Sequence, residues 1–398
     1  MRVGIITNEY VSEKANFDGG IANHLSKIAI ALKEMGHEPI VFVTSESNET
    51  IQHAGIEVIR VKKEINFLYK LFDKISRFNY QTWLNVIWES YALRKRIRKY
   101  DKSNKIDVLL FTSFKSLGIL RPRRIPSLML LAGSVELWDQ ANGLEYRSFR
   151  EKQFLILEKF DIKFTKNIYA PSHFLANEMG KRYKKKIDVI ETPFLPQFKN
   201  PDYTTLELIN TKFKNQPYLI FFGRIALFKG AIDIADLLED LFEHDKQINF
   251  LFVGKDLGYQ GGSTIDYIKK KVSNYIDRIE IVEQVPHNQL FPLIQGAKGV
   301  VLPSRIENLS NASIETLALG KALIASRGVS FEQVVEEGKN GFLAEHSNPK
   351  DLLRAIIHFL SLDEQQIKEM EANSLKTIER LHPSITVGRL IDKLQEIT

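Results

Sequence analysis

Cysteine is missing from the 398 residues of this chain. Its absence excludes disulfide bonds, a thiolate nucleophile, iron–sulfur clusters and cysteine zinc sites. Long apolar runs are missing too, because no window approaches the about 18 apolar residues that a membrane-spanning helix needs. The apolar run at the start of the chain stops at Asn8 and Glu9, too early for a signal peptide. We therefore expect a cytoplasmic protein whose membrane contact is at most peripheral.

The residues that are present have the balance of a soluble globular protein. Hydrophobic residues make up 44% and charged residues 26%, and the mean hydropathy is -0.18. A chain of 398 residues exceeds what one hydrophobic core usually supports, so two domains are expected. Residues 1–196 carry 32 Lys and Arg against 22 Asp and Glu, a net charge of +10, whereas the remainder carries 23 against 27, a net charge of -4. A basic first half thus precedes a mildly acidic second half.

Short apolar strands alternate with amphipathic helices in both halves, which predicts an α/β fold of two doubly wound, Rossmann-like domains. We expect these domains at 1–195 and 196–380, with a short hinge inside the proline-containing stretch 191–217. Residues 381–398 are expected to form a C-terminal helix, a candidate to pack back on the N-terminal domain. The predicted strands are 2–7, 39–44, 57–61, 107–111, 127–131 and 167–170 in the first half, and 218–222, 249–253, 279–282, 299–302 and 322–325 in the second.

Open parallel sheets bind ligands beyond the carboxyl ends of their strands, so the residues that follow strands are the first candidates for a binding site. Gly19 and Gly20 open the predicted helix 21–35, where backbone N–H groups could meet an anion; an ordinary glycine turn is the alternative. After strand 218–222 come Gly223, Arg224 and Lys229. The two cations suit adjacent phosphates, although solvated surface cations would give the same pattern.

A third segment, Pro303 to Gly320, follows strand 299–302 and contains Glu307 and Glu315. The first glutamate lies in the loop, and the second lies in the first turns of a helix that Ser310 or Asn311 can cap. One carboxylate could accept both hydroxyls of a ribose while the other holds hydroxyls of a sugar. Glutamates at this spacing also arise by chance, so the prediction depends on their place after a strand.

Four segments together resemble the retaining GT-B glycosyltransferases of the family 4-like, glycosyl transferases group 1 type. They are the Gly-Gly loop, the Gly-Arg-x4-Lys-Gly segment, the Glu-x7-Glu segment and Gly338-Lys339-Asn340-Gly341-Phe342. The resemblance covers nearly the whole chain and is strongest over 218–353. It implies two Rossmann-like domains facing a cleft, with the first on the acceptor side and the second binding the nucleotide-sugar. It also implies transfer of a hexose-type sugar, with retention, to a glycan or lipid-linked acceptor in surface polysaccharide or lipopolysaccharide biosynthesis.

The resemblance implies roles for individual residues. Arg224 and Lys229 would grip the diphosphate and stabilise charge on the leaving phosphate, and Glu315 would hold the ribose. Glu307 would orient the transferred sugar rather than attack it. The further donor-binding positions that the resemblance implies are Gly19, Gly20, Gly223, Asn308, Leu309 and Ser310.

No metal or other cofactor is expected, since such enzymes generally need none and the chain has no Asp-x-Asp motif. UDP and GDP both stay open as the nucleotide of the donor. The loop Lys255 to Tyr259 is a candidate to read the base.

One position departs from the family pattern. Many relatives carry a histidine after a strand of the first domain, where this chain has Ala132. Ser134 and Glu136 are candidates to compensate, whereas His24, His37 and His173 are expected to be structural. The departure keeps an alternative open, in which the chain is a non-catalytic nucleotide-sugar-binding partner subunit. An epimerase or a phosphorylase is not expected, because neither acid–base groups around the sugar nor a pyridoxal-phosphate lysine is visible.

Residues 60–105 carry 13 basic against four acidic residues, interleaved with aromatic residues. Such a segment fits the anionic surface of a membrane, and we expect peripheral contact of the basic N-terminal half with the cytoplasmic face of the inner membrane. The alternative is that the aromatic residues fill the core and the charges form a solvated face. Nucleic acid is not expected as a partner, because no motif for binding it is present.

Overall fold

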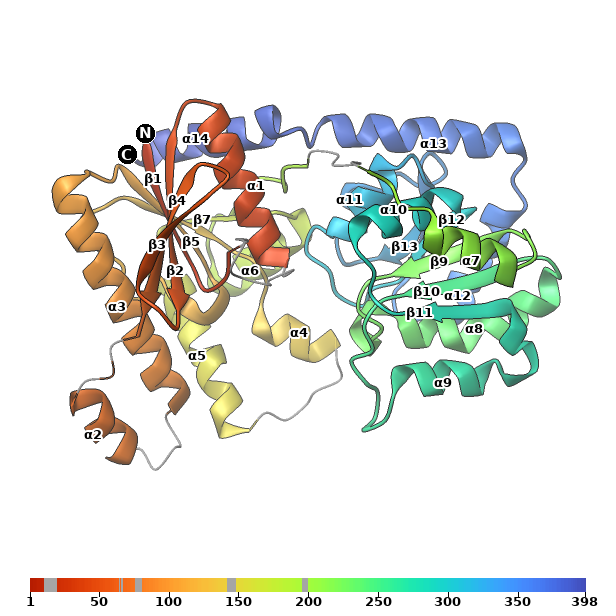
Figure 1. Ribbon diagram of the computed structural model, residues 1–398, viewed down its shortest axis with the longest axis horizontal. Coiled ribbons are helices and arrows are strands. Elements are labelled where there is room, and N and C mark those ends of the chain that lie inside the picture. The colour runs from red at the N-terminus through yellow and green to blue at the C-terminus, as the bar shows by residue number, and fades with distance from the viewer. Residues whose placement is uncertain (11–19, 64, 66, 76–80, 142–147, 195–199) are drawn as a thin grey trace. The chain divides into compact units, whose positions relative to one another are not determined.

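The computed structural model describes residues 1–10, 20–63, 65, 67–75, 81–141, 148–194 and 200–398 (Figure 1). The chain divides into two compact units, an N-terminal unit of Met1–Phe194 with Leu381–Thr398, and a C-terminal unit of Leu195–Arg380. Each unit is built on one sheet of mainly parallel strands flanked by helices. The predicted α/β class with two doubly wound sheets is therefore confirmed.

The sheet of the N-terminal unit has the order β3-β4-β2-β1-β5-β6-β7-β8, and only β3 is antiparallel to its neighbour. The sequence missed β3, because its side chains alternate between half-buried and exposed and leave no apolar run. The strands are β1 (Arg2–Thr7), β2 (Glu38–Ser45), β3 (Glu49–His53), β4 (Ile56–Lys62), β5 (Val108–Thr112), β6 (Ser127–Leu130), β7 (Asn167–Ala170) and β8 (Asp188–Val189). The helices are α1 (Gly20–Glu34), α2 (Phe67–Ile75), α3 (Gln81–Ser103), α4 (Val135–Ala141), α5 (Phe149–Phe164) and α6 (His173–Tyr183).

The last helix, α14 (Pro383–Ile397), belongs to the N-terminal unit although it ends the chain. It packs on α1, and its Val387, Leu390 and Leu394 join the core that also contains Leu25 and Leu32. At the point where the chain returns to this unit, the N–H of Phe194 donates to the carbonyl of Leu381 at 2.9 Å. The N-terminal core is thus completed by residues from the end of the chain.

The C-terminal unit has a fully parallel sheet of order β11-β10-β9-β12-β13-β14. Its strands are β9 (Tyr218–Phe222), β10 (Asn249–Val253), β11 (Ile279–Val282), β12 (Gly299–Leu302), β13 (Leu323–Arg327) and β14 (Gly341–Glu345). Its helices are α7 (Thr204–Lys212), α8 (Ala231–His244), α9 (Thr264–Lys271), α10 (His287–Gly296), α11 (Asn311–Ala318), α12 (Pro349–Leu360) and α13 (Glu364–Glu379). The boundary between the two units, after Phe194, falls inside the stretch 191–217 that was predicted to hold the hinge, and α7 occupies part of that stretch. Because only Ile209 of α7 is buried, that helix leaves little apolar periodicity in the sequence.

The strand order of the C-terminal unit reverses beside β9. The chain proceeds from β9 outward to β10 and β11, and then returns to the other side of β9 to form β12. The loops that follow β9 and β12 therefore leave neighbouring strands at the carboxyl edge in opposite directions, which is where open α/β sheets bind ligands.

Candidate functional site

Two loops meet at this reversal point, the β9 loop (Gly223–Gly230) and the β12 loop (Pro303–Ser310). Gly230 has φ +77°, and a Cβ atom placed there would lie 2.1 Å from the carbonyl oxygen of Pro303. Only glycine permits both this backbone conformation and this close approach. The backbone N–H of Arg305 also donates to the carbonyl of Phe228 at 2.9 Å. The two loops are therefore joined through their backbones.

Two residues predicted from separate motifs form an ion pair across these loops. The ammonium group of Lys229 donates to Oε2 of Glu307, and the hydroxyl of Ser304 donates to the same oxygen at 3.3 Å. The side chains of Lys229 and Glu307 are only 17% and 10% exposed. Losing one partner of such a pair would leave a poorly solvated charge. The fold thus places a cation and a carboxylate side by side at the carboxyl edge.

A second ion pair, which the sequence did not reveal, supports the first. Arg305 donates two hydrogen bonds, of 3.0 and 2.6 Å, to the carboxylate of Asp233 in the first turn of α8. Burial raises the pKa of Asp233, and the guanidinium of Arg305 opposes that shift. Because Lys229 immediately precedes the turn into α8, this pair ties the start of α8 to the β12 loop. The sequence signal for this ion pair was Asp233 itself, a charged residue among the apolar residues that α8 buries.

Arg224 lies in the same loop as Lys229. Its guanidinium carbon is 4.8 Å from the ring centre of Phe228, a cation–π distance. The neighbouring Ile225 exchanges backbone hydrogen bonds with the loop that follows β10 (the β10 loop, Gly254–Ser263), donating to Lys255 at 2.9 Å and accepting from Leu257 at 3.1 Å. The loop predicted to read the base therefore lies directly beside the β9 loop.

Asp256 organises that β10 loop. It accepts hydrogen bonds from the N–H of Gly258 at 2.8 Å, the hydroxyl of Ser263 at 2.6 Å and the N–H of Thr264 at 3.1 Å. Burial raises the pKa of Asp256, but these hydrogen bonds outweigh it and lower the pKa to about 2. Asp256 is thus an anion that holds the loop in shape.

The remaining predicted donor residues lie along the β12 loop and α11. Ser310 is the N-cap of α11 and accepts from the N–H of Ser313 at 3.4 Å, which decides between Ser310 and Asn311. The hydroxyl of Ser330 donates to the carbonyl of Asn308, and Leu309 is buried. The loop carrying these amides is consequently held from both sides.

Glu315 lies in α11 and is 14% exposed. Its Oε1 is 3.6 Å from Nε2 of His287, the first residue of α10. His287 was not predicted as a site residue, because it stands alone after Pro286 in the sequence. The structure places it beside the carboxylate that was predicted to hold a ribose.

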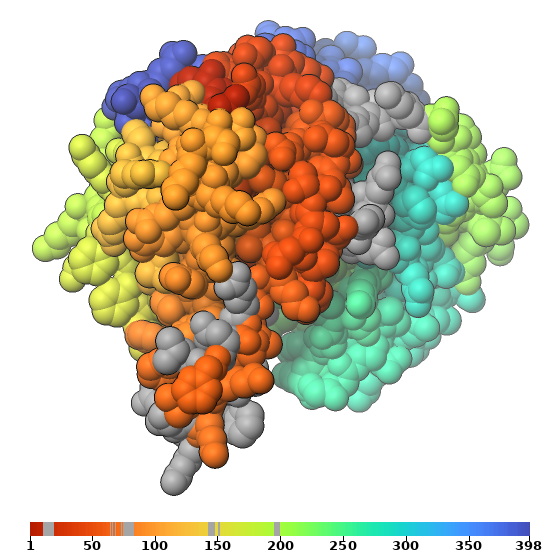
Figure 2. All heavy atoms as spheres, turned by 60° about the vertical axis from the view of Figure 1, so that its left-hand side comes forward, coloured from red at the N-terminus to blue at the C-terminus, as the bar shows by residue number. Residues whose placement is uncertain are grey.

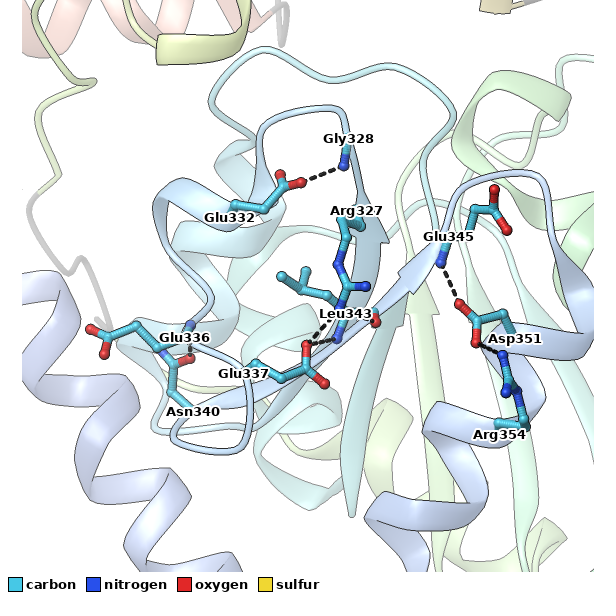
Figure 3. Close-up of polar contacts among 10 residues, drawn as sticks. All are labelled: Arg327, Gly328, Glu332, Glu336, Glu337, Asn340, Leu343, Glu345, Asp351 and Arg354. Carbon is cyan, nitrogen blue, oxygen red and sulfur yellow. Dashed lines mark hydrogen bonds and ion pairs between the residues drawn. The ribbon is translucent and has the colours of Figure 1, made fainter.

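The fourth family segment, Gly338 to Phe342, forms a braced turn that leads into β14. Figure 3 shows the amide oxygen of Asn340 accepting from the N–H of Glu336, and Glu337 receiving both the N–H of Leu343 and the guanidinium of Arg327. All of these contacts lie within the turn and its neighbouring strands. They give this segment a structural role.

The predicted residues of the N-terminal unit are only partly described. Gly20 begins α1, while Gly19 lies outside the described residues. The N–H of Ala132 donates to the hydroxyl of Ser113 at 3.2 Å. Of the two candidates to compensate for the missing histidine, Glu136 is paired with Arg182 at 2.5 Å. The hydroxyl of Ser134 is buried and meets no hydrogen-bonding partner among the described residues, so Ser134 is the better candidate.

The three histidines that were expected to be structural, His24, His37 and His173, lie in helices of the N-terminal unit or next to them. His24 is buried in α1, where burial, helped by the nearby charge of Lys27, lowers its pKa to about 3. The ring of His37 lies 3.2 Å from the N-terminal amino group. His173 is the first residue of α6, directly after the N-cap Ser172.

Both halves of the chain match families of known proteins. Residues 18–194 match the family described as Glycosyltransferase Family 4, and residues 204–376 match the family described as Glycosyl transferases group 1. An uncharacterized glycosyltransferase of Methanocaldococcus jannaschii is 21% identical over 355 residues, 87% of this chain and 86% of that protein. The N,N'-diacetylbacillosaminyl-diphospho-undecaprenol alpha-1,3-N-acetylgalactosaminyltransferase of Campylobacter jejuni is 23% identical over 234 residues, 57% of this chain and 56% of that one.

Solved structures share the fold over its whole length. Sucrose-phosphate synthase from Thermosynechococcus elongatus superposes with a TM-score of 0.73 at 18% identity, covering 99% of this chain and 98% of that one. Anabaena HepE in complex with UDP gives 0.72 at 14% identity and covers both chains completely. The chain is therefore a glycosyltransferase of the family 4 type, with the GT-B fold.

Proposed function

We propose that the chain is a retaining glycosyltransferase that moves a hexose-type sugar from a UDP- or GDP-sugar to a glycan or lipid-linked acceptor in surface polysaccharide or lipopolysaccharide biosynthesis. The observation that carries this proposal is the Lys229–Glu307 pair at the reversal point of the C-terminal sheet. A diphosphate-linked sugar offers anionic oxygens beside hydroxyl groups, and the pair offers a cation beside a carboxylate. The UDP bound to HepE and the diphospho-undecaprenol in the name of the Campylobacter relative support the two substrate classes.

In the proposed reaction, the anomeric C–O bond of the donor breaks while negative charge grows on the leaving phosphate. Lys229 and Arg224 would stabilise that charge. The acceptor oxygen would bond to the anomeric carbon on the face that the phosphate leaves, and its proton would pass to a phosphate oxygen. No carboxylate base is then required, and with two cations at the diphosphate we propose no metal.

Glu307 would position the sugar in this scheme. Its carboxylate already accepts from both Lys229 and Ser304, and these hydrogen bonds reduce its power as a nucleophile. Glu315 would hold the ribose, with His287 beside it. The amides of the β12 loop would meet phosphate or sugar oxygens near the N-terminus of α11.

The alternative, a non-catalytic nucleotide-sugar-binding subunit, rests on Ala132. The two hypotheses differ in whether the protein turns over its donor. Binding of a nucleotide-sugar without transfer or hydrolysis would support the non-catalytic subunit. Detection of either reaction would exclude it.

Thermal shift measurements with UDP, GDP, ADP and their sugars, each with and without a chelator, test the donor site. A ligand present at 100 times its dissociation constant adds about 2.7 kcal/mol of stability. We expect one nucleotide family to stabilise the protein regardless of chelator, and Lys229→Met to lose that effect while the exposed control Lys246→Met retains it. The anomeric configuration of the product, read by NMR, then tests retention. A protein that no nucleotide stabilises would contradict the proposed donor site.

A further inference from the structure

Helix α5 of the N-terminal unit buries one face and exposes a continuous apolar stripe on the other. Ile156, Phe160 and Phe164 follow one another at intervals of four residues and are 38%, 47% and 60% exposed. Residues four apart lie on the same side of a helix. The rings of Phe160 and Phe164 stack with their centres 6.0 Å apart and an angle of 9° between their planes. These large apolar side chains therefore form one exposed surface.

The stripe is flanked by cations. Lys152, Lys159 and Lys163 are exposed on the same helix, and the ammonium group of Lys163 lies 6.0 Å from the ring centre of Phe164. By contrast, Glu158 and Asp161 are buried on the inner side. Among the described side chains of α5, the exposed face is thus apolar and basic, while the carboxylates face inward.

Helix α2 repeats the pattern. Phe67, Leu71 and Phe72 are 76%, 40% and 50% exposed, with the exposed Lys70 and Lys74 among them. Figure 2 shows α2, in orange, projecting at the lower end of the N-terminal unit. Two exposed apolar and basic helices therefore belong to one unit.

Both helices pack on α3. The rings of Tyr69 and Phe72 contact that of Trp88 at centre distances of 5.7 and 6.0 Å, and the N–H of Trp83 donates to the side chain of Gln153 at 3.1 Å. The two exposed faces are therefore anchored to the same helix.

We infer that the exposed faces of α5 and α2 dock the N-terminal unit on an anionic lipid bilayer. Helices with aromatic residues on one face and lysines beside them lie in the interface of a bilayer, where the rings enter the acyl boundary and the lysines meet headgroup phosphates. A second copy of this chain is a poorer occupant, because a two-fold contact would set lysines against lysines.

Helix α2 lies inside the stretch 60–105 for which the sequence predicted membrane contact, whereas α5 lies outside it, so the part of the surface formed by α5 is defined only by the folded chain. The inference does not rest on the transfer chemistry. Vesicle binding and nucleotide binding are measured separately, and either can fail alone.

The test is co-sedimentation of the full chain with vesicles of phosphatidylcholine, with or without phosphatidylglycerol. We expect binding to the anionic vesicles that added salt weakens. The double substitution Phe160→Ser and Phe164→Ser should weaken this binding by about tenfold or more, because the affinity of a helix for a bilayer interface increases with the apolar area that enters the bilayer. The matched control, Leu208→Ser with Leu375→Ser, removes two exposed apolar side chains of the C-terminal unit and should leave binding unchanged.

A charge variant separates the two contributions. Lys159→Gln with Lys163→Gln should lower affinity for the anionic vesicles about fivefold per lysine and leave the weak binding to neutral vesicles unchanged. Lys269→Gln with Lys270→Gln, exposed on α9 of the C-terminal unit, is its control.

Three results would overturn the inference: no binding of the wild-type chain to anionic vesicles, equal loss in the phenylalanine variant and its control, or a wild-type dimer that the phenylalanine variant makes monomeric in light scattering. The thermal unfolding transition of each variant without nucleotide shows whether it is folded, and the shift of that transition with nucleotide reports on the donor site. It also separates failure of the docking surface from failure of the proposed donor site.

Discussion

The carboxyl edges of the two sheets are built differently. In the C-terminal unit, the loops after β9 and β12 are joined by the Lys229–Glu307 and Arg305–Asp233 pairs. In the N-terminal unit, Asn8, Thr112 and Ser134 follow or end neighbouring strands, and their buried side-chain oxygens lack hydrogen-bonding partners among the described residues. The two sheets therefore differ at their carboxyl edges. Ion pairs join the loops at the edge of the C-terminal unit, whereas buried polar groups at the edge of the N-terminal unit have no hydrogen-bonding partner among the described residues.

The outer surfaces differ as well. All six exposed phenylalanines of the described residues lie in the N-terminal unit: Phe67, Phe72, Phe114, Phe149, Phe160 and Phe164. The net charge of +10 also falls on residues 1–196. The edge proposed to bind the donor belongs to the C-terminal unit, and the surface inferred to bind a membrane belongs to the N-terminal unit. Substitutions can therefore alter one without the other.

The largest effect is expected from breaking the second ion pair of the C-terminal edge. Arg305→Met leaves Asp233, whose side chain is 4% exposed, without its partner and should cost about 3 to 5 kcal/mol of unfolding free energy. Urea denaturation followed by circular dichroism measures the loss. The control is Arg354→Met, which breaks an exposed pair with Asp351 and should change little. A loss no greater than that of the control would show that the Arg305–Asp233 pair does not hold the edge together.

Transfer activity should respond next, through Lys229. Lys229→Met removes one of the two cations proposed at the leaving phosphate, so kcat/KM should fall by about 100-fold to 1,000-fold. The steady-state rate of donor consumption measures it, with Lys246→Met as the control. Retention of full activity would remove Lys229 from the proposed reaction and leave the ion pair with a purely structural role.

Donor binding should weaken on loss of Glu315. Glu315→Ala removes the carboxylate proposed to accept the ribose hydroxyls, and the dissociation constant of the nucleotide should rise by the equivalent of about 1.5 to 3 kcal/mol. Isothermal titration calorimetry measures the change, and Glu243→Ala on the exposed side of α8 serves as the control. An unchanged dissociation constant would exclude the ribose role.

The smallest effect concerns the N-terminal core and depends on pH. The pKa of His24 is about 3 in the folded chain and about 6.5 when unfolded, so between these values only the unfolded chain takes up the proton. Stability from this group is therefore full above pH 6.5 and falls as the pH drops, by about 2 kcal/mol at pH 5. The free energy of unfolding of His24→Leu should therefore fall by about 2 kcal/mol less than that of wild type between pH 7.5 and pH 5.

Tryptophan fluorescence is a suitable probe for this measurement, because Trp83, Trp88 and Trp138 are the only tryptophans of the chain and all belong to the N-terminal unit. The exposed His346→Leu is the control. Asp161, whose pKa burial raises to about 6 against the charge of Arg121, contributes in the opposite direction. Its contribution is present in wild type and variants alike, so the comparison removes it. If the stability of His24→Leu and that of wild type depended equally on pH, the lowered pKa of His24 in the folded chain would be contradicted.

The aromatic residues of 60–105 divide between core and surface, and membrane contact of this stretch stays a prediction. Tyr69 is buried, as expected of aromatic residues that fill a core, whereas Phe67 and Phe72 are exposed, as expected of a membrane-facing surface. The sequence could not distinguish them, because the choice depends on which side of α2 packs on α3.

The sequence by itself determined most of the succession of strands, with β3, β8 and β14 as the exceptions, the place of each motif after its strand and the uneven charge. These features depend on the period of apolar residues and on local glycine and capping residues, which act over a few positions. Only the tertiary structure decided that Lys229 meets Glu307, that Arg305 meets Asp233 and that His287 meets Glu315. Those partners stand 78, 72 and 28 positions apart, so they meet only because the parallel crossovers bring the ends of distant strands to one edge. The exposed stripe of α5 was likewise decided by packing, since a helix with apolar residues on several sides can bury only the side that packs on its neighbours, here α3, α4 and the turn at Phe114–Ser116.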